Sequence, residues 1–324
     1  MTAEKQLIPF SQAIAATRLD ISSYSSTLLE SCMVGSVPNG GYVASCLLEA
    51  ASEHMRSKGQ SDTLCAHFEF IDRIAAGPAV ILVEEVKLGR QLSTLHLTLY
   101  QGGLLSTAPW IMQRVSKKKL VAYVTCFNLS LQSGLSLKTS YSPPNLLPIN
   151  FERVLKDGKD ENWGPYAPKT FDNTDFKIRI WEHAAFYVPL RGQHSRSVID
   201  FWVRLKCGEL FTNNMLAFLA DSWPHVIEGY RVQPGEEPGS EEIPATALMW
   251  YSTIVFNLDI KKGLPKGTHW LRSRVEAKEI RNGKLDLETL IFDPDGDLVA
   301  LSNHVNLVMS ADRNMAEPKT RSQI

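Results

Sequence analysis

The feature that most constrains the fold is a pattern that occurs twice, an apolar helix followed by a run of strands. In the first half, a corner at Pro38–Gly41 opens the segment 41–58, whose apolar residues recur with the helical period. Strand-like alternation then continues from 63 to 131. In the second half, an apolar helix around Asp221 is expected at 210–226, and alternating segments follow between 253 and 308.

One helix laid across an antiparallel sheet, present twice, predicts an α+β protein of the double hotdog type. The chain has 324 residues, more than one core usually holds, so two domains are expected. We expect the first hotdog domain at 1–131 and the second at 177–313. The stretch 132–176, which has little periodicity, is expected to be a linker, and 314–324 a flexible tail.

The composition of the chain limits which binding partners and which cellular compartment are expected. A formal net charge of −1 gives no electrostatic reason to expect nucleic acid or an anionic membrane as a partner. The N-terminus lacks a signal-peptide pattern, and no apolar run approaches the roughly 18 residues that span a bilayer. The five cysteines are scattered and never spaced as Cys-x-x-Cys, which favours a reducing compartment. A cytoplasmic protein is expected.

Motifs for cofactors and metals are absent from the sequence. There is no Walker loop, dinucleotide fingerprint, Gly-x-Ser-x-Gly elbow or His-Glu-x-x-His. The acidic turn Asp293–Asp297 lacks the downstream glutamate that a calcium loop requires, so it predicts a hairpin. We therefore expect no cofactor and no metal site.

Three motifs carry a resemblance to a known family. The stretches Gly35–Tyr42, Leu219–Pro224 and Asp297–Ser302 resemble the TesB-type acyl-CoA thioesterases, and more closely the thioesterase-like branch common in fungi. The resemblance covers roughly residues 20–312, with the motifs in the same order and spacing. It implies a double hotdog that cleaves acyl thioesters.

The resemblance also implies a set of catalytic residues. In that family an aspartate on the second central helix, a Thr or Ser on the next strand and a Gln on the last strand hold a water against the thioester carbonyl. The matching positions here are Asp221, then Thr253 with Ser252 beside it, and His304 in place of the Gln. Asn303 adjoins His304, but strand alternation points its side chain to the other face.

The residues themselves leave alternatives open. A carboxylate in the apolar context of Asp221 is costly unless it is hydrogen-bonded, and desolvation raises its pKa towards general-base use. It is equally compatible with a structural aspartate at a helix end. His304 either donates to the water or oxyanion and adds a titrating group, or it marks a site turned to other chemistry.

The Pro38–Gly41 corner is the second mechanistic element. A Gly pair at a helix N-terminus lets a ligand approach free N–H groups at the positive end of the helix dipole. Asn39, Gly40 and Gly41, together with Ser252, are therefore candidate substrate-binding residues, for an oxyanion or a phosphopantetheine arm. The alternative is an ordinary turn into a helix.

Three functions follow from these observations. The first is hydrolysis of an acyl-CoA, or of an acyl or polyketide chain on a carrier protein, by water activated by Asp221. The second is a tailoring reaction of a fungal biosynthetic pathway (cyclisation, isomerisation or dehydration) in the same pocket. The third is non-catalytic acyl binding. Because the open edges of hotdog sheets need partners, a homo-oligomer such as a dimer is also expected.

Overall fold

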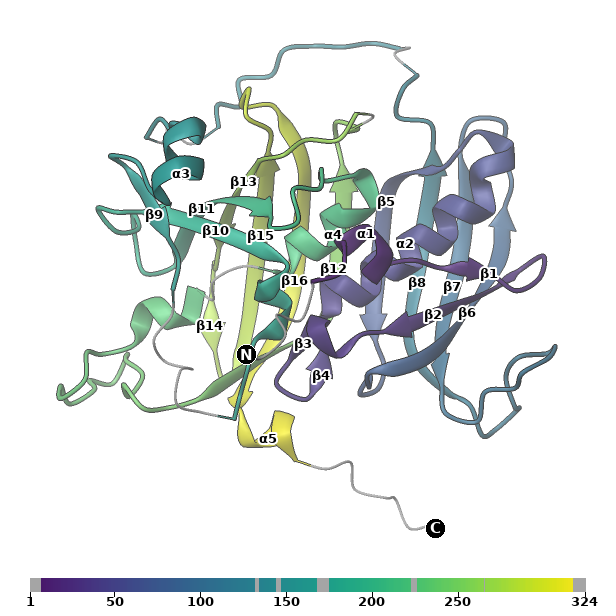
Figure 1. The fold of residues 1–324 in the computed structure, drawn as a ribbon, viewed down its shortest axis with the longest axis horizontal. Coiled ribbons are helices and arrows are strands. Elements are labelled where there is room, and N and C mark those ends of the chain that lie inside the picture. The colour runs from purple at the N-terminus through teal and green to yellow at the C-terminus, as the bar shows by residue number, and fades with distance from the viewer. Residues whose placement is uncertain are drawn as a thin grey trace.

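A computed structural model describes residues 7–131, 134–143, 147–167, 175–222, 226–264 and 266–316 (Figure 1). The first half contains α1 (Phe10–Ala13), β1 (Thr17–Arg18), β2 (Ser23–Leu28), β3 (Met33–Val34), β4 (Val37–Pro38), α2 (Gly40–Met55), β5 (Asp62–Phe70), β6 (Gly77–Lys87), β7 (Ser93–Gln101) and β8 (Lys117–Phe127).

The second half begins with α3 (Phe151–Asp157), β9 (Trp163–Pro165), β10 (Ala184–Pro189), β11 (Val198–Leu205) and α4 (Leu216–Ala220). It continues with β12 (Met249–Ile260), β13 (Leu271–Glu276), β14 (Ile280–Arg281), β15 (Lys284–Phe292), β16 (Leu298–Ser310) and α5 (Asp312–Met315).

Both halves share one antiparallel sheet. Within the described residues the strand order is β1-β2-β6-β7-β8-β5-β12-β16-β15-β13-β11-β10-β9, with β14 paired to β15. The halves join where β5 pairs with β12, from Val255 opposite Glu69 to Asp259 opposite Cys65. Each of these strands is the first sheet strand after the central helix of its half. Their pairing removes one open edge from each half.

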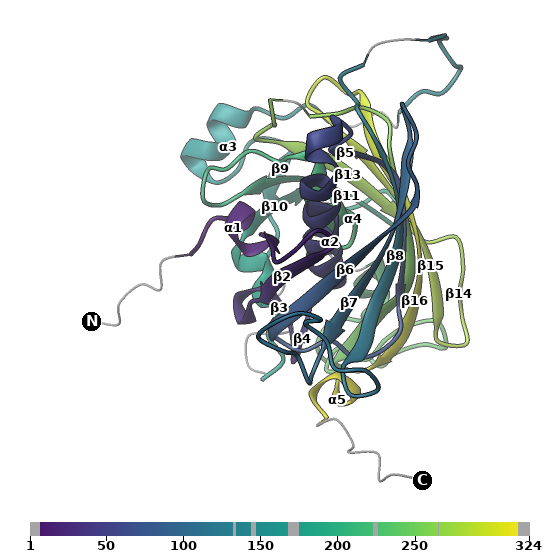
Figure 2. The ribbon, with the colours of Figure 1, turned by 90° about the vertical axis from the view of Figure 1, so that its right-hand side faces the viewer.

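The helices α2 and α4 lie on the same side of the curved sheet, as the side view makes plain (Figure 2). Apolar side chains from the helices and from both halves of the sheet form one hydrophobic cluster. Helix α2 is buried along most of its length, including Val43, Leu47 and Ala51. A helix that is apolar on most sides is stable only when it is covered on most sides.

The ends of α2 follow from its sequence. Asn39 is the N-cap, and its side-chain oxygen accepts a hydrogen bond from Tyr42 N at 2.8 Å. The helix continues as a 3₁₀ turn, Arg56–Lys58, and stops at Gly59, which has a φ of 65°. A left-handed residue of this kind commonly ends a helix and favours glycine.

Two elements differ from their sequence predictions. The helix expected at 210–226 is much shorter, because a 3₁₀ turn at Asn213–Met215 leads into α4 and the backbone leaves the helical region at Asp221, with φ −115° and ψ 8°. The sequence also predicts a strand over 176–189, and the structure confines it to β10. The residues before it, Arg179–Glu182, form a 3₁₀ turn.

The expected linker and tail contain structure of their own. Within 132–176, β9 pairs with β10 at the edge of the sheet, and Val154 of α3 packs in a cluster with Trp163 and Trp202. Asn314, expected to begin the tail, is buried, and its side chain accepts a hydrogen bond from Ser36 N. Residues 317–324 lie outside the described residues.

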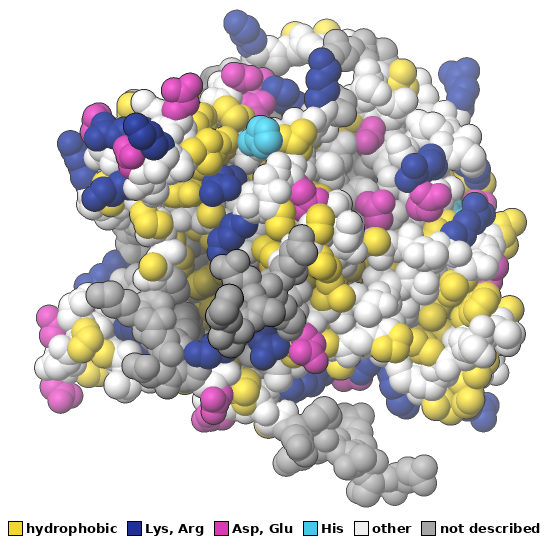
Figure 3. Space-filling model, in the orientation of Figure 1, with side chains coloured by type: hydrophobic (Ala, Val, Ile, Leu, Met, Phe, Trp, Pro, Cys, Tyr) yellow, Lys and Arg dark blue, Asp and Glu magenta, His cyan; other side chains and the backbone are white. Residues whose placement is uncertain are grey.

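The surface carries mixed charge. On the face displayed in Figure 3, acidic and basic side chains are interspersed, in keeping with the net charge of −1. None of the helices in the described part of the chain has the length and apolar character that crossing a bilayer requires.

Gly41 packs against α4, the other central helix, and replacing it tests that packing. A Cβ on Gly41 would lie 2.4 Å from the Ala217 carbonyl oxygen and 2.7 Å from Asp221 Cβ. Gly41→Ala is therefore expected to lower the free energy of unfolding by about 1–3 kcal/mol in urea denaturation. Gly239→Ala, whose Cβ would meet only Glu242 at 3.5 Å, is the matched control. Equal stability of the two variants would contradict this packing.

Candidate active site

A cavity of about 360 Å³ lies where the two halves meet. It is enclosed by the β3–β4 hairpin, the start of α2, the end of β5 and the start of β12. Its apolar wall includes Val34, Val37, Phe70, Ile74, Trp250 and Ile254, and its polar wall includes Asn39, Arg73, Asp221, Ser252, Thr253 and Asn306. The apolar wall suits an acyl chain, and the polar groups provide a reaction centre.

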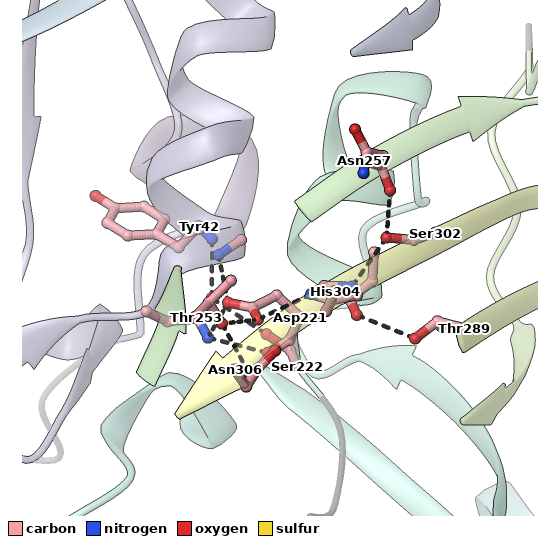
Figure 4. A network of polar contacts seen from close by, with 12 residues as sticks. Tyr42, Asp221, Ser222, Thr253, Asn257, Thr289, Ser302, His304 and Asn306 are labelled. Atoms are coloured by element: carbon pink, nitrogen blue, oxygen red, sulfur yellow. Dashed lines mark hydrogen bonds and ion pairs between the residues drawn. The ribbon is translucent and has the colours of Figure 1, made fainter. Parts of the chain in front are cut away.

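Asp221 is a cavity acid that is held by both halves of the chain (Figure 4). Its Oδ1 accepts a hydrogen bond from the Thr253 hydroxyl at 2.8 Å. Its Oδ2 accepts from Gly41 N at 2.7 Å and from Asn39 Nδ2 at 3.3 Å. The carboxylate therefore sits at the N-terminus of α2, where the helix dipole and free N–H groups favour negative charge.

Asn306 completes the polar group on the cavity. Thr253 gives its one hydroxyl hydrogen to Asp221, so its oxygen must accept from Asn306 Nδ2, which lies 3.1 Å away. Asn306 Oδ1 is buried and has no partner among the described residues. At the cavity wall, the Asn306 amide nitrogen therefore already donates to Thr253, whereas its amide oxygen can still accept a hydrogen bond.

Burial has the largest effect on the pKa of Asp221. It raises the pKa of the carboxyl from 3.8 to about 6, against the hydrogen bonds from Thr253 and Gly41, which lower it. A carboxyl with such a pKa is ionised at neutral pH yet basic enough to accept a proton from water.

The structure brings together most of the residues predicted from sequence. Asp221, Thr253 and Asn39 form one hydrogen-bonded group, and Ser252 and Gly40 line the cavity. Gly41, expected to face the substrate, instead donates its N–H to Asp221.

His304 occupies a different place from the one predicted for it. Its side chain is 0% exposed and is not part of the cavity wall. Its Nδ1 lies 3.8 Å from Asp221 Oδ1, so it stands behind the acid rather than beside a water in the cavity. Burial lowers the pKa of His304 to about 3, which keeps the ring neutral at physiological pH.

Arg73 is one polar cavity residue that the sequence analysis missed, and Asn306 is another. The signal was present, because Ser302, His304 and Asn306 alternate along β16 and all three are buried. Polar residues at every second position of a strand mark one face that is polar inside the protein. The described residues contain no group of three His, Cys, Asp or Glu side chains that could hold a metal ion.

Comparison with solved structures identifies the class. A hot dog fold protein of unknown function from Alicyclobacillus acidocaldarius matches with a TM-score of 0.71 and 16% identity, covering 93% of this chain and 98% of that one. The tesB protein of Mycobacterium avium subspecies paratuberculosis matches with a TM-score of 0.61 and 11% identity, over 93% and 98% of the two chains. The fold is that of a double hotdog protein, which confirms the fold predicted from the sequence.

Sequence comparison identifies the family. The model of the acyl-CoA thioesterase N-terminal domain matches residues 29–126, and that of the C-terminal domain matches residues 151–308. The thioesterase-like protein TwmA of Talaromyces wortmannii is 42% identical over 97% of this chain and 96% of its own length. The ustilagic acid biosynthesis cluster protein orf2 of Mycosarcoma maydis is 25% identical over 68% of this chain and 54% of its own. The chain belongs to the acyl-CoA thioesterase family, as the three motifs predicted.

The buried acid should leave a signature in stability that does not depend on catalysis. Because the folded-state pKa of Asp221 is raised, its stabilising contribution is complete below pH 3.8 and is lost as pH rises through about 6. Asp221→Asn removes this titration. Its stability relative to the native chain should therefore rise by about 2 kcal/mol between pH 4 and pH 7 in urea denaturation. Asp259→Asn, at a partly exposed carboxylate outside the cavity, is the matched control. A difference between Asp221→Asn and the native chain that does not change with pH would mean that the acid is not buried.

Proposed function

We propose that the protein hydrolyses acyl thioesters by direct attack of a water molecule that Asp221 activates. The observation that carries this proposal is the buried Asp221 carboxylate on the cavity wall, anchored by the N-terminus of α2 and by Thr253. Membership of the acyl-CoA thioesterase family supports the same chemistry.

In this mechanism Asp221 takes a proton from water as the water oxygen bonds to the thioester carbonyl carbon. The tetrahedral intermediate then collapses, the C–S bond breaks, and the proton passes from Asp221 to the departing sulfur. The products are a free acid and a thiol. Asn306 Oδ1, which has no partner among the described residues, and the Thr253 hydroxyl oxygen are placed to orient the water.

The oxyanion that forms from the thioester carbonyl needs a hydrogen-bond donor that is not already bonded to another acceptor. Gly41 N–H is bonded to Asp221, whereas Gly40 lines the cavity and its N–H belongs to the first helical turn, which the helix itself leaves unbonded. We assign the polarisation of the thioester carbonyl to Gly40 N–H and the α2 dipole. A side chain at this position would not fit, because a Cβ would lie 2.8 Å from Asp221 Oδ2.

The substrate is proposed to be an acyl chain on a phosphopantetheine arm, attached either to CoA or to a carrier protein. The apolar wall of the cavity would receive the acyl group. Arg73 on the same cavity, held through Nη2 by the Asn314 carbonyl at 2.7 Å, provides a fixed cation suited to a phosphate. The name of the relative from Mycosarcoma maydis, a biosynthesis cluster protein, supports a role in the biosynthesis of a secondary metabolite, for which we propose a cytoplasmic location.

A homo-oligomer, in the simplest case a dimer, is part of the same proposal. In the described chain the sheet ends in short strands, β1 on one side and β9 on the other, and their outer edges are open to pairing.

The decisive variant for this proposal is Asp221→Asn. Removing a general base typically costs 10²–10⁴-fold in turnover, so kcat should fall at least about 100-fold while KM changes little. In the native enzyme, kcat/KM should decline below about pH 6, since the protonated acid cannot accept a proton. Thiol release from acyl-CoA and from acyl N-acetylcysteamine thioesters provides the measurement. Asp259→Asn, on the same strand as Thr253 and outside the cavity, is the control. Unchanged kcat in Asp221→Asn would refute the mechanism.

A further inference from the structure

The β3–β4 hairpin forms one wall of the cavity without belonging to the main sheet. Val34, Val37 and Pro38 of this hairpin line the cavity, and in the described chain β3 and β4 form a two-stranded sheet of their own. A two-stranded hairpin by itself is at best marginally stable in water. The position of this wall must therefore be set by the residues that pack against it.

The C-terminal turn α5 holds the hairpin in place, and the two lie at the same end of the molecule (Figure 1 and Figure 2). The Asn314 side chain is fully buried and binds the hairpin backbone. Its Oδ1 accepts a hydrogen bond from Ser36 N at 2.8 Å, and its Nδ2 donates to the Val34 carbonyl oxygen at 3.1 Å. An asparagine side chain supplies both the acceptor and the donor that these contacts need.

Gly35, at the turn of the hairpin, allows Asn314 to approach this closely. Its φ is 61°, in the left-handed region that favours glycine, and a Cβ there would lie 2.1 Å from Asn314 Oδ1. The contact therefore requires particular residues on both sides, a glycine on the hairpin and an asparagine on α5.

Arg73 is fixed by the same contact. Its Nη2 donates to the Asn314 carbonyl oxygen at 2.7 Å and to Ser36 Oγ at 2.5 Å. These two bonds use both hydrogens of Nη2, whereas Nε and Nη1 have no hydrogen-bond partner within the described chain. Because Arg73 lines the cavity, its remaining N–H groups can bind an anionic ligand there.

The charges around Arg73 also favour an anion. Asp72 lines the same cavity, but its carboxylate forms an ion pair with Lys119 at 2.8 Å. Asp221, the other acid among the lining residues, is bonded to Thr253 and to the start of α2. The groups that fix Arg73, a hydroxyl and a carbonyl, are uncharged. A cation held in this way binds an anion without the entropic cost of ordering a mobile side chain.

We propose that Asn314 is a positioning residue that acts through Arg73, and that the two, joined to the β3–β4 hairpin, bind the phosphate of a phosphopantetheine arm. The inference rests on the proposed phosphopantetheine substrate. CoA and a carrier protein both present this phosphate. The C-terminal turn, which the sequence analysis assigned to the start of a flexible tail, thereby contributes to substrate binding.

The first test uses two ligands that differ only in the phosphate, pantetheine and phosphopantetheine, with affinities measured by isothermal titration calorimetry. Hydrogen bonds between charged groups are strong, so phosphopantetheine should bind the native protein roughly 10- to 100-fold more tightly. Arg73→Gln should bring the two affinities close together. Arg313→Gln, which removes an exposed arginine of α5 outside the cavity, is the matched control and should keep the preference. Equal affinities in the native protein, or no binding of either ligand, would overturn the inference.

Asn314→Ala tests the positioning role. Without its contacts to Ser36 and Val34, the preference for phosphopantetheine should fall by about fivefold, the equivalent of one net hydrogen bond. In an Arg73→Gln background the same change should add nothing to the loss, because Asn314 acts through Arg73. A residue with only a structural role would lower stability, or weaken both ligands alike, and leave the preference intact. That result would overturn the positioning role.

A second variant covers the case in which Asn314→Ala does not fold. Ser36→Ala removes the hydroxyl that joins Arg73 to the hairpin and leaves the α5 sequence unchanged. It should reduce the preference for phosphopantetheine in the same way, and an unchanged preference would overturn the inference.

CoA, as a third ligand, distinguishes the two sources of phosphate. Arg73→Gln should weaken CoA and phosphopantetheine by the same factor, because both present the phosphate next to the pantetheine arm. A loss for CoA alone would place the bound phosphate on the nucleotide and overturn the assignment. None of the three ligands contains a thioester, so these results do not depend on hydrolysis. The proposed hydrolysis fails separately, through Asp221→Asn.

Discussion

The hydrogen bond between the Asp221 carboxylate and the N-terminus of α2 is the interaction on which the rest of the site depends. The acid comes from the end of α4 in the second half, and its partner Gly41 begins the helix of the first half. The bond requires the two helices to approach closely, which Gly41 permits. It also requires the two halves of the sheet to be joined, as they are where β5 pairs with β12.

This interaction explains how a buried acid is tolerated and why it is useful. Burial alone would keep the carboxyl protonated, whereas the helix N-terminus, Thr253 and Asn39 stabilise the charged form. The balance leaves a pKa near 6, where the group is ionised at neutral pH and remains a base. The cost falls on the stability of the fold, and in the proposed mechanism the benefit is a base already positioned on the cavity wall.

Periodicity in the sequence predicted the repeated helix and sheet, whereas the resemblance to the TesB-type family singled out Asp221 and Thr253, which the structure joins by a hydrogen bond. The sequence analysis did not predict that Gly41 would bind the acid, since that contact joins residues 180 positions apart. It also placed His304 at the water rather than behind Asp221. How deeply a side chain of β16 is buried depends on the register between β16 and β12. That register shifts between Thr253 and Val255. Asn306 lies two residues beyond His304 on β16, so strand alternation alone places it on the same buried face.

In the proposed mechanism water attacks the thioester carbonyl directly, and Asp221 acts as a base and not as a nucleophile. A single turnover with enzyme in excess over acyl-CoA, carried out in ¹⁸O-labelled water, tests it most directly. Direct attack predicts one ¹⁸O atom in the released acid, stoichiometric free thiol and an unlabelled Asp221 peptide by mass spectrometry. Label in the Asp221 peptide would indicate a covalent acyl intermediate, and a product formed without labelled acid or free thiol would indicate a different reaction. Either result would contradict the account.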